Sequence, residues 1–206
     1  MTSYRHAARA AAVTAAVSAA ALTLAACGTD SGRTSATAST SASASAPGSA
    51  AGSLYNAADV SFAQGMIPHH RQAVEMADLA ATRASSAEVK KLAAEIKKAQ
   101  DPEIKTLSGW LTSWDAQVPT QGSMDHSGHS MPGMMADTDM STLEKATGPA
   151  FDTAFLNLMV KHHEGAVEMA RTEKSAGADK RAKDMADAII TSQSAEITRM
   201  NKLLDN

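Results

Sequence analysis

Apolar residues recur at helical spacing through most of the chain after residue 54. In the clearest stretch, Phe62, Met66 and Ala73 fall within roughly a third of the circumference of a helix, and Glu75 falls on the opposite side. The dominant residue types (Ala, Leu, Met, Glu and Lys) also favour helix, and strand patterns are nearly absent from the sequence. The pattern predicts four helices, over residues 55–84, 86–114, 149–175 and 179–204. We therefore expect an all-α domain.

Capping and helix-breaking residues refine these boundaries. A Ser-Ser pair separates the first two helices, and Asp179 is a suitable N-cap for the fourth. Pro68 and Pro102 lie inside predicted helices, where proline removes a backbone hydrogen bond, so we expect each to kink or restart its helix. Residues 115–140 are rich in Gly, Ser, Met and His and are expected to form a long connection.

The two predicted hairpins are copies of one another. Residues 62–77 recur as residues 155–170, and each residue of the second copy lies 93 positions after its counterpart, as His162 follows His69. The correspondence continues into the next helix, where both copies carry Gln-x-x-Glu-Ile. A lone hairpin cannot bury its apolar face, whereas two hairpins can bury each other's. The predicted fold is therefore a four-helix bundle built from a duplicated hairpin.

Each copy places two adjacent histidines beside the core-facing stripe, near the midpoint of its helix. They are His69, His70, His162 and His163. At mid-helix, the four imidazoles can meet inside the bundle whether these helices run parallel or antiparallel. Glu103 and Glu196 lie on the apolar stripes of the following helices, where a carboxylate is costly unless it is paired. They can accept a hydrogen bond from a histidine ring and leave its other nitrogen for a metal, or bind the metal themselves.

Methionines supply a second kind of candidate ligand. Imidazole and thioether together are the ligands that soft metal ions, above all copper, prefer, and a thioether binds Cu(I) without losing a proton. The repeated motif contributes Met66, Met76, Met159 and Met169, each of which by itself is more typical of core filler than of a ligand. The long connection contributes Met124, His126, His129, Met131, Met134 and Met135. This second set has no apolar periodicity, which favours metal binding over packing.

The N-terminal residues have the composition of an export signal. Residues 1–26 combine a short basic start with an apolar run that ends in Leu-Ala-Ala before Cys27. This arrangement is typical of a bacterial lipoprotein signal, with Cys27 lipidated. Residues 27–53 are mostly Ser, Ala, Thr and Gly and are expected to form a flexible tether ahead of the domain at 54–206. We expect an exported protein anchored by lipid to the outer face of the cell membrane.

Charge and composition narrow the possible partners. The formal net charge is −3, and the chain has only two Trp, two Tyr and three Phe. A basic surface with stacking aromatic residues is therefore not available, which argues against nucleic-acid binding. Because Cys27 is the only cysteine, an intrachain disulfide is excluded. The sequence leaves the oligomeric state open.

The repeated motif resembles a known family. Phe-x-x-x-Met-x-x-His-His-x-x-Ala-Val-Glu-Met-Ala, present twice and followed each time by Gln-x-x-Glu-Ile, is similar to the bacterial domain-of-unknown-function 305 family over residues 54–205. The resemblance implies a ferritin-like four-helix bundle in exported proteins, some of which are associated with copper binding and copper tolerance. It points to the four motif histidines, with the four motif methionines as possible partners. The Met/His-rich connection separately resembles segments of bacterial copper-resistance proteins.

Three functional hypotheses follow. The first is a membrane-anchored protein that sequesters copper, as Cu(I) and through the histidines as Cu(II), without enzymatic chemistry. The second is a ferritin-like di-metal oxidase, although no Glu in the sequence is followed three residues later by the His that the usual di-iron pattern requires. The third is a metal-free helical interaction module whose histidines organise the core or sense pH. The sequence does not fix the valence of the metal or the number of sites.

Overall fold

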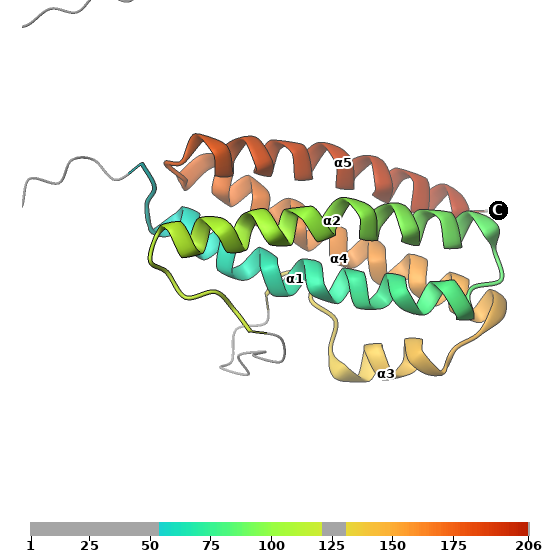
Figure 1. Ribbon diagram of the computed structural model, residues 1–206. Helices are drawn as coiled ribbons and strands as arrows, with labels where there is room; N and C mark the ends of the chain where they lie inside the picture. Colours follow the sequence, from blue (N-terminus) through green and yellow to red (C-terminus); the bar gives the residue numbers. More distant parts are fainter. Residues whose placement is uncertain (1–53, 121–130, 206) are drawn as a thin grey trace, which may run out of the picture. The chain divides into compact units, whose positions relative to one another are not determined.

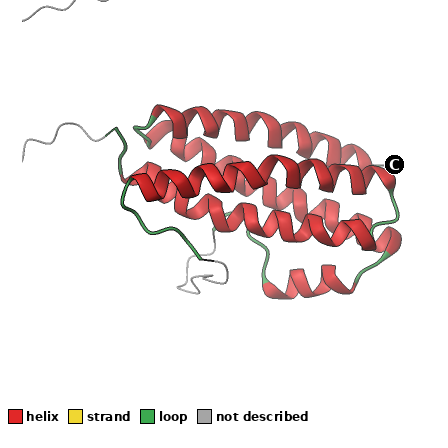
Figure 2. Ribbon diagram, in the orientation of Figure 1, coloured by secondary structure: helices red, strands yellow, loops and turns green. Residues whose placement is uncertain are grey.

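The computed structural model describes residues 54–120 and 131–205, and these residues form five helices and no β-strand (Figures 1 and 2). The helices are α1 (Ala57–Arg83), α2 (Ala87–Ser113), α3 (Asp137–Lys145), α4 (Gly148–Ala176) and α5 (Lys180–Leu204). The four long helices match the four predicted ones to within two residues at each end, so the all-α bundle is confirmed. The predicted signal, Cys27, the tether and the ligands Met124, His126 and His129 lie outside the described residues.

Side-chain caps define where the long helices begin. The Asn56 side chain accepts hydrogen bonds from the first turn of α1, and the Ser86 side chain accepts one at the start of α2. Asp179 accepts from Arg181 N at the start of α5, as its sequence position predicted. Both α1 and α2 continue through their prolines, so of the two expected outcomes, a kink or a restart, neither helix restarts at Pro68 or Pro102. Packing on both sides of each proline outweighs the lost backbone hydrogen bond.

The contacts between α1 and α4 establish the topology of the bundle. The second half of α1 shares an apolar cluster with the first half of α4, and the first half of α1 shares another with the second half of α4. These two helices are therefore antiparallel. Since each hairpin is itself antiparallel, the order is up, down, down, up, and the connection from α2 to α4 must travel the length of the bundle (Figure 1). One long crossover is the arrangement of ferritin-like bundles.

The crossover includes α3, a short helix that the hydrophobic pattern did not predict. It packs against α1 and α4 through Met140 and Leu143, which are its two buried residues. This helix therefore lies along the face where the two hairpins meet. None of the described helices combines the length and apolar character needed to cross a membrane.

A band of polar residues separates the two apolar clusters. On every long helix, the residues of one cluster and those of the other are interrupted at mid-helix by residues that belong to neither. We call this band the central polar layer; it consists of His69, His70, Gln100, Glu103, His162, His163, Gln193 and Glu196. All four of its histidines are fully buried. Polar groups at this depth need hydrogen-bond partners or a ligand, which directs attention to this layer as a site.

Candidate metal centre

Histidines from both copies of the repeat meet at the centre of the bundle. The ring centroids of His69 on α1 and His162 on α4 are 3.8 Å apart, with the ring planes tilted by 42°. His163 lies beside His162, at a centroid distance of 6.4 Å. The packing of α1 against α4 over both halves brings the midpoints of the two helices to the same level, and the histidines lie at these midpoints.

Carboxylates on the outer helices orient one histidine of each pair. His70 Nε2 lies 2.7 Å from Glu103 Oε2, and His163 Nε2 lies 2.7 Å from Glu196 Oε2. With Nε2–H donating to the carboxylate, the neutral form of each ring has its free lone pair on Nδ1. The two Glu side chains are 23% and 21% exposed, so they remain partly hydrated and avoid the full cost of burying a charge.

The other histidine of each pair, His69 or His162, has different hydrogen-bond partners in the two copies of the repeat. His69 Nε2 lies 3.1 Å from the carbonyl oxygen of Pro132, which comes from the crossover. A carbonyl can only accept, so Nε2 carries the hydrogen and Nδ1 keeps its lone pair. His162, the repeat counterpart, has a partner for neither ring nitrogen among the described residues. Three of the four rings are thus held in one tautomer.

Burial keeps the imidazole rings of His69 and His162 neutral. Loss of water and, to a smaller extent, the neighbouring His70 lower the pKa of His69 to about 3, against an opposing effect of the hydrogen bond to the Pro132 carbonyl. Burial likewise lowers the pKa of His162 well below its ordinary value, with additional repulsion from His69 and His163. A neutral imidazole is the form that ligates metal ions, because its second nitrogen carries a lone pair.

Several buried polar atoms of the central polar layer have no partner within the described residues. They are the Nδ1 atoms of His69, His70, His162 and His163, the Nε2 atom of His162 and the amide oxygens of Gln100 and Gln193. Leaving so many buried acceptors unpaired costs stability, and most buried polar atoms in native proteins have a hydrogen-bond partner or a bound ligand. Four buried imidazole nitrogens with free lone pairs and two carbonyl-type oxygens are suitable ligand atoms for a cation, so the residue types present fit a metal ion. Neither glutamine was among the site residues predicted from the sequence, although both belong to the repeated Gln-x-x-Glu.

The central polar layer contains candidate ligand atoms, but these atoms are not arranged as a coordination shell. Among residues 54–120 and 131–205, no group of three or more His, Cys, Asp or Glu side chains is arranged to hold a metal ion. The rings of His69 and His162 contact one another, whereas those of His70 and His163 face carboxylates on the outer helices. Ligation would therefore require the buried rings to turn their Nδ1 atoms toward a common point.

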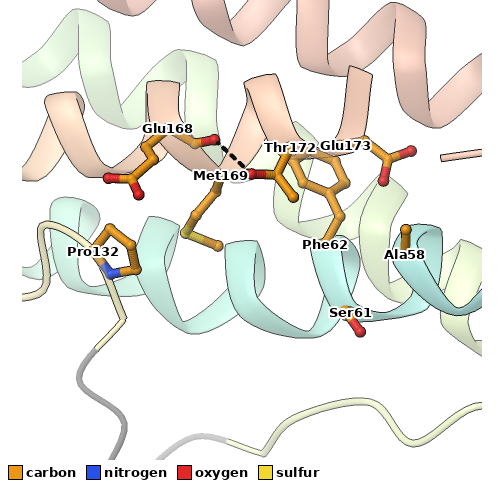
Figure 3. A pocket seen from close by; sticks show the side chains of 8 residues that line it. All are labelled: Ala58, Ser61, Phe62, Pro132, Glu168, Met169, Thr172 and Glu173. Atoms are coloured by element: carbon orange, nitrogen blue, oxygen red, sulfur yellow. Dashed lines mark hydrogen bonds between the residues drawn. The ribbon is translucent and has the colours of Figure 1, made fainter. Parts of the chain in front are cut away.

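The motif methionines divide between the core and the surface. Met66, Met76 and Met159 are fully buried within the apolar clusters, above and below the histidines. Met169 is only partly buried and lines a pocket of about 190 Å³ with Phe62, Pro132 and Glu173 (Figure 3). The structure thus places three of the four predicted thioethers as packing residues and leaves one facing an opening between α1 and α4.

Two thioethers from separate segments converge beside that pocket. A Cβ atom at Gly65 would lie 2.8 Å from Met169 Cε and 3.6 Å from Met131 Sδ, so both side chains lie over this glycine. Gly65 is one turn before His69 on α1. Farther along the crossover, Met135 is held by its backbone and packs against an apolar cluster, while Met134 is partly exposed.

Comparisons with known proteins identify the family. The profile of DUF305, a domain of unknown function, matches residues 59–204. A candidate secreted protein of this family from Streptomyces coelicolor is 34% identical, with a TM-score of 0.65, over 72% of this chain and 91% of its own. CopM in a Cu(I)-bound form is 34% identical, with a TM-score of 0.61, over 72% of this chain and 96% of its own. Its Cu(II)-bound form is 38% identical, with a TM-score of 0.63, over the same shares. No curated protein matches. Because the family profile covers more than half of the chain, this protein belongs to the DUF305 family.

Proposed function

We propose that this protein binds copper ions outside the cytoplasm and sequesters them without enzymatic chemistry. The observation that carries the proposal is the set of four buried, unpartnered Nδ1 atoms in the central polar layer. Three of these rings have a hydrogen-bond acceptor on Nε2, which is the arrangement that presents Nδ1 to a metal. The copper-bound forms of CopM, at 34% and 38% identity, add support.

The donor types suggest two classes of site with different preferences. Neutral imidazoles in the bundle suit both Cu(I) and Cu(II), whereas the thioethers of the crossover suit Cu(I). Met131 and Met169 already lie together over Gly65, at the edge of the bundle. We propose that this pair and the other crossover ligands hold Cu(I), and that the histidines form the tighter site. CopM also has silver-bound forms, and silver, like Cu(I), is a soft ion.

The proposed location depends on the N-terminal sequence. The lipoprotein-type signal and Cys27 favour export and attachment to the outer face of the membrane. The candidate secreted relative from Streptomyces coelicolor also favours export. Metabolic labelling with a fatty-acid analogue tests the anchor, because Cys27→Ala should abolish incorporation.

A competition titration of the mature protein against a chromophoric Cu(I) chelator tests the bundle site. His162→Leu is the sharpest variant, because neither ring nitrogen of His162 has a hydrogen-bond partner within residues 54–120 and 131–205, and a leucine side chain suits a buried position. We expect the tightest site to weaken at least about tenfold while the thermal midpoint stays the same or rises. Ile67→Leu, a buried change two residues before His69, is the control and should leave binding unchanged. Equal copper affinity in His162→Leu and the unmodified protein would refute the bundle site.

A further inference from the structure

One segment of the crossover contacts the central polar layer directly. We call residues 131–135 the strap. Its Pro132 carbonyl receives the hydrogen bond from His69 Nε2, although Pro132 itself is exposed at the surface. Glu103 and Glu196 do the same for His70 and His163, but from helices of the bundle. The strap is therefore the one acceptor of the three that does not belong to a long helix.

The strap is seated against α4 by backbone contact. A Cβ atom at Gly165 would lie 2.1 Å from Pro132 O and 2.5 Å from Gly133 Cα, which is closer than any side chain allows. Gly133 has a φ of +77°, and a Cβ atom there would lie 2.8 Å from His162 O. Glycine is required on both sides of this contact, because the two backbones approach too closely for any side chain. The contact lies at the same turn of α4 as the two histidines.

A glutamine on α1 holds the other end of the strap. Gln72 Nε2 donates to Met135 O at 3.0 Å, and Gln72 Oε1 accepts from Met135 N at 2.8 Å. Gln72 and Gly165 are counterparts in the repeat, each two residues after a His-His pair. The two copies therefore differ at this position for a structural reason. Gln72 forms hydrogen bonds with the strap, whereas Gly165 leaves room for its backbone.

We propose that the strap positions His69 for metal binding, and that the affinity of the bundle site depends on whether the strap is seated. The Pro132 carbonyl fixes the hydrogen on Nε2 and so leaves Nδ1 as the ligand atom. The strap also carries Met131, whose sulfur lies over Gly65 beside Met169, so one short segment links the thioethers to the imidazoles. The affinity part of this proposal rests on the proposed function, whereas the tautomer part does not.

The decisive variant is Gly165→Ala, which places a methyl group where the Pro132 carbonyl now lies. Alanine favours helix more than glycine does, so α4 should form and only the strap should be displaced. Gly109→Ala on α2 is the matched control, because a Cβ atom there meets nothing within 4 Å. Gln72→Leu releases the strap in a second way, without adding bulk at α4. Thermal melts establish that each variant is folded.

The first measurement uses metal-free protein and nitrogen NMR of the imidazole rings. We expect His69 to be a single Nε2–H tautomer in the unmodified protein and in Gly109→Ala, and to become a mixture in Gly165→Ala and Gln72→Leu. The second measurement is the Cu(I) competition titration. We expect the tightest site to weaken about tenfold in the two strap variants, with the number of sites unchanged.

The outcomes separate this proposal from the copper function. An unchanged His69 tautomer in both strap variants overturns the positioning role. A changed tautomer with unchanged copper affinity overturns the coupling between strap and site. If the unmodified protein binds no copper, the proposed function and the coupling both fail, while the tautomer measurement still decides the positioning role.

Discussion

Glu173 is a buried carboxyl group that lies outside the central polar layer. It is 1% exposed, and neither of its oxygens receives a hydrogen bond from a donor among the described residues. Burial, together with the hydrogen bond and charge of Asp59, raises its pKa to about 8, against a smaller opposing effect of Lys183. For Asp59, burial alone would raise the pKa, but hydrogen bonds from Asn56 N, Ala178 N and Asp179 N lower it overall. At neutral pH, Glu173 is therefore protonated and donates to the Asp59 carboxylate.

This pair predicts a stability that falls as the pH rises. The pKa of Glu173 is about 4.5 in the unfolded chain and about 8 in the folded protein, so folding binds a proton between these values. Its stabilising contribution is complete below about pH 4.5 and is lost as the pH rises through about 8. Glu173→Gln keeps a donor toward Asp59 and removes the titration. In urea unfolding from pH 4.5 to above pH 8, we expect the advantage of the variant over the unmodified protein to grow and then level off. A constant difference across this range would contradict the shared proton.

At the scale of elements, the long helices were predictable and the crossover was not. Each long helix carries an apolar stripe over 25 residues or more, so the periodic pattern repeats often enough to be read. In α3, only Met140 and Leu143 are buried among nine residues, which is too few for a period to emerge. The strap has no periodic pattern of apolar residues, because its position is set by the backbone contact with Gly165 and by the hydrogen bonds of Gln72. The sequence identified the four histidines and their two glutamates, but nothing in it pointed to the Pro132 carbonyl.

Leu143 should hold α3 on the bundle. It is fully buried, and α3 contacts the rest of the protein through little else. Leu143→Ala should therefore raise the free energy of the docked state of α3 by about 2–5 kcal/mol, the usual cost of removing a buried leucine side chain. We expect faster amide hydrogen exchange in α3 and unchanged exchange at the centres of α1 and α4. Glu144→Ala, at an exposed neighbouring position, is the control. Equal acceleration across the long helices would mean that α3 unfolds only with the whole bundle.

At the scale of the whole molecule, each hairpin supplies an aspartate that accepts hydrogen bonds from the turn of the other hairpin. Asp152, at the start of α4, accepts hydrogen bonds from Ser85 and Ser86 in the α1–α2 turn, including Ser86 N at 2.9 Å. Its repeat counterpart Asp59, at the start of α1, accepts from Ala178 N and Asp179 N in the α4–α5 turn, at 3.1 and 2.9 Å. The duplication thus extends to a reciprocal exchange of contacts. The signal was present in the sequence, as an Asp three residues before the phenylalanine of each motif.

The reciprocal contacts should make both hairpins depend on one another for stability. Asp152→Ala removes a carboxylate that accepts several hydrogen bonds and leaves two backbone amides of the α1–α2 turn without their acceptor. Because hydrogen bonds to a charged group contribute about 1.5–3 kcal/mol each, we expect the free energy of unfolding to fall by about 2 kcal/mol or more. The loss should appear as a single cooperative transition in urea, followed by far-ultraviolet circular dichroism, since both hairpins lose stability together. Asp187→Ala, which removes an exposed ion pair with Lys174 within the second hairpin, is the control and should change the free energy by less than about 1 kcal/mol. A second transition in Asp152→Ala would show instead that the two hairpins unfold independently.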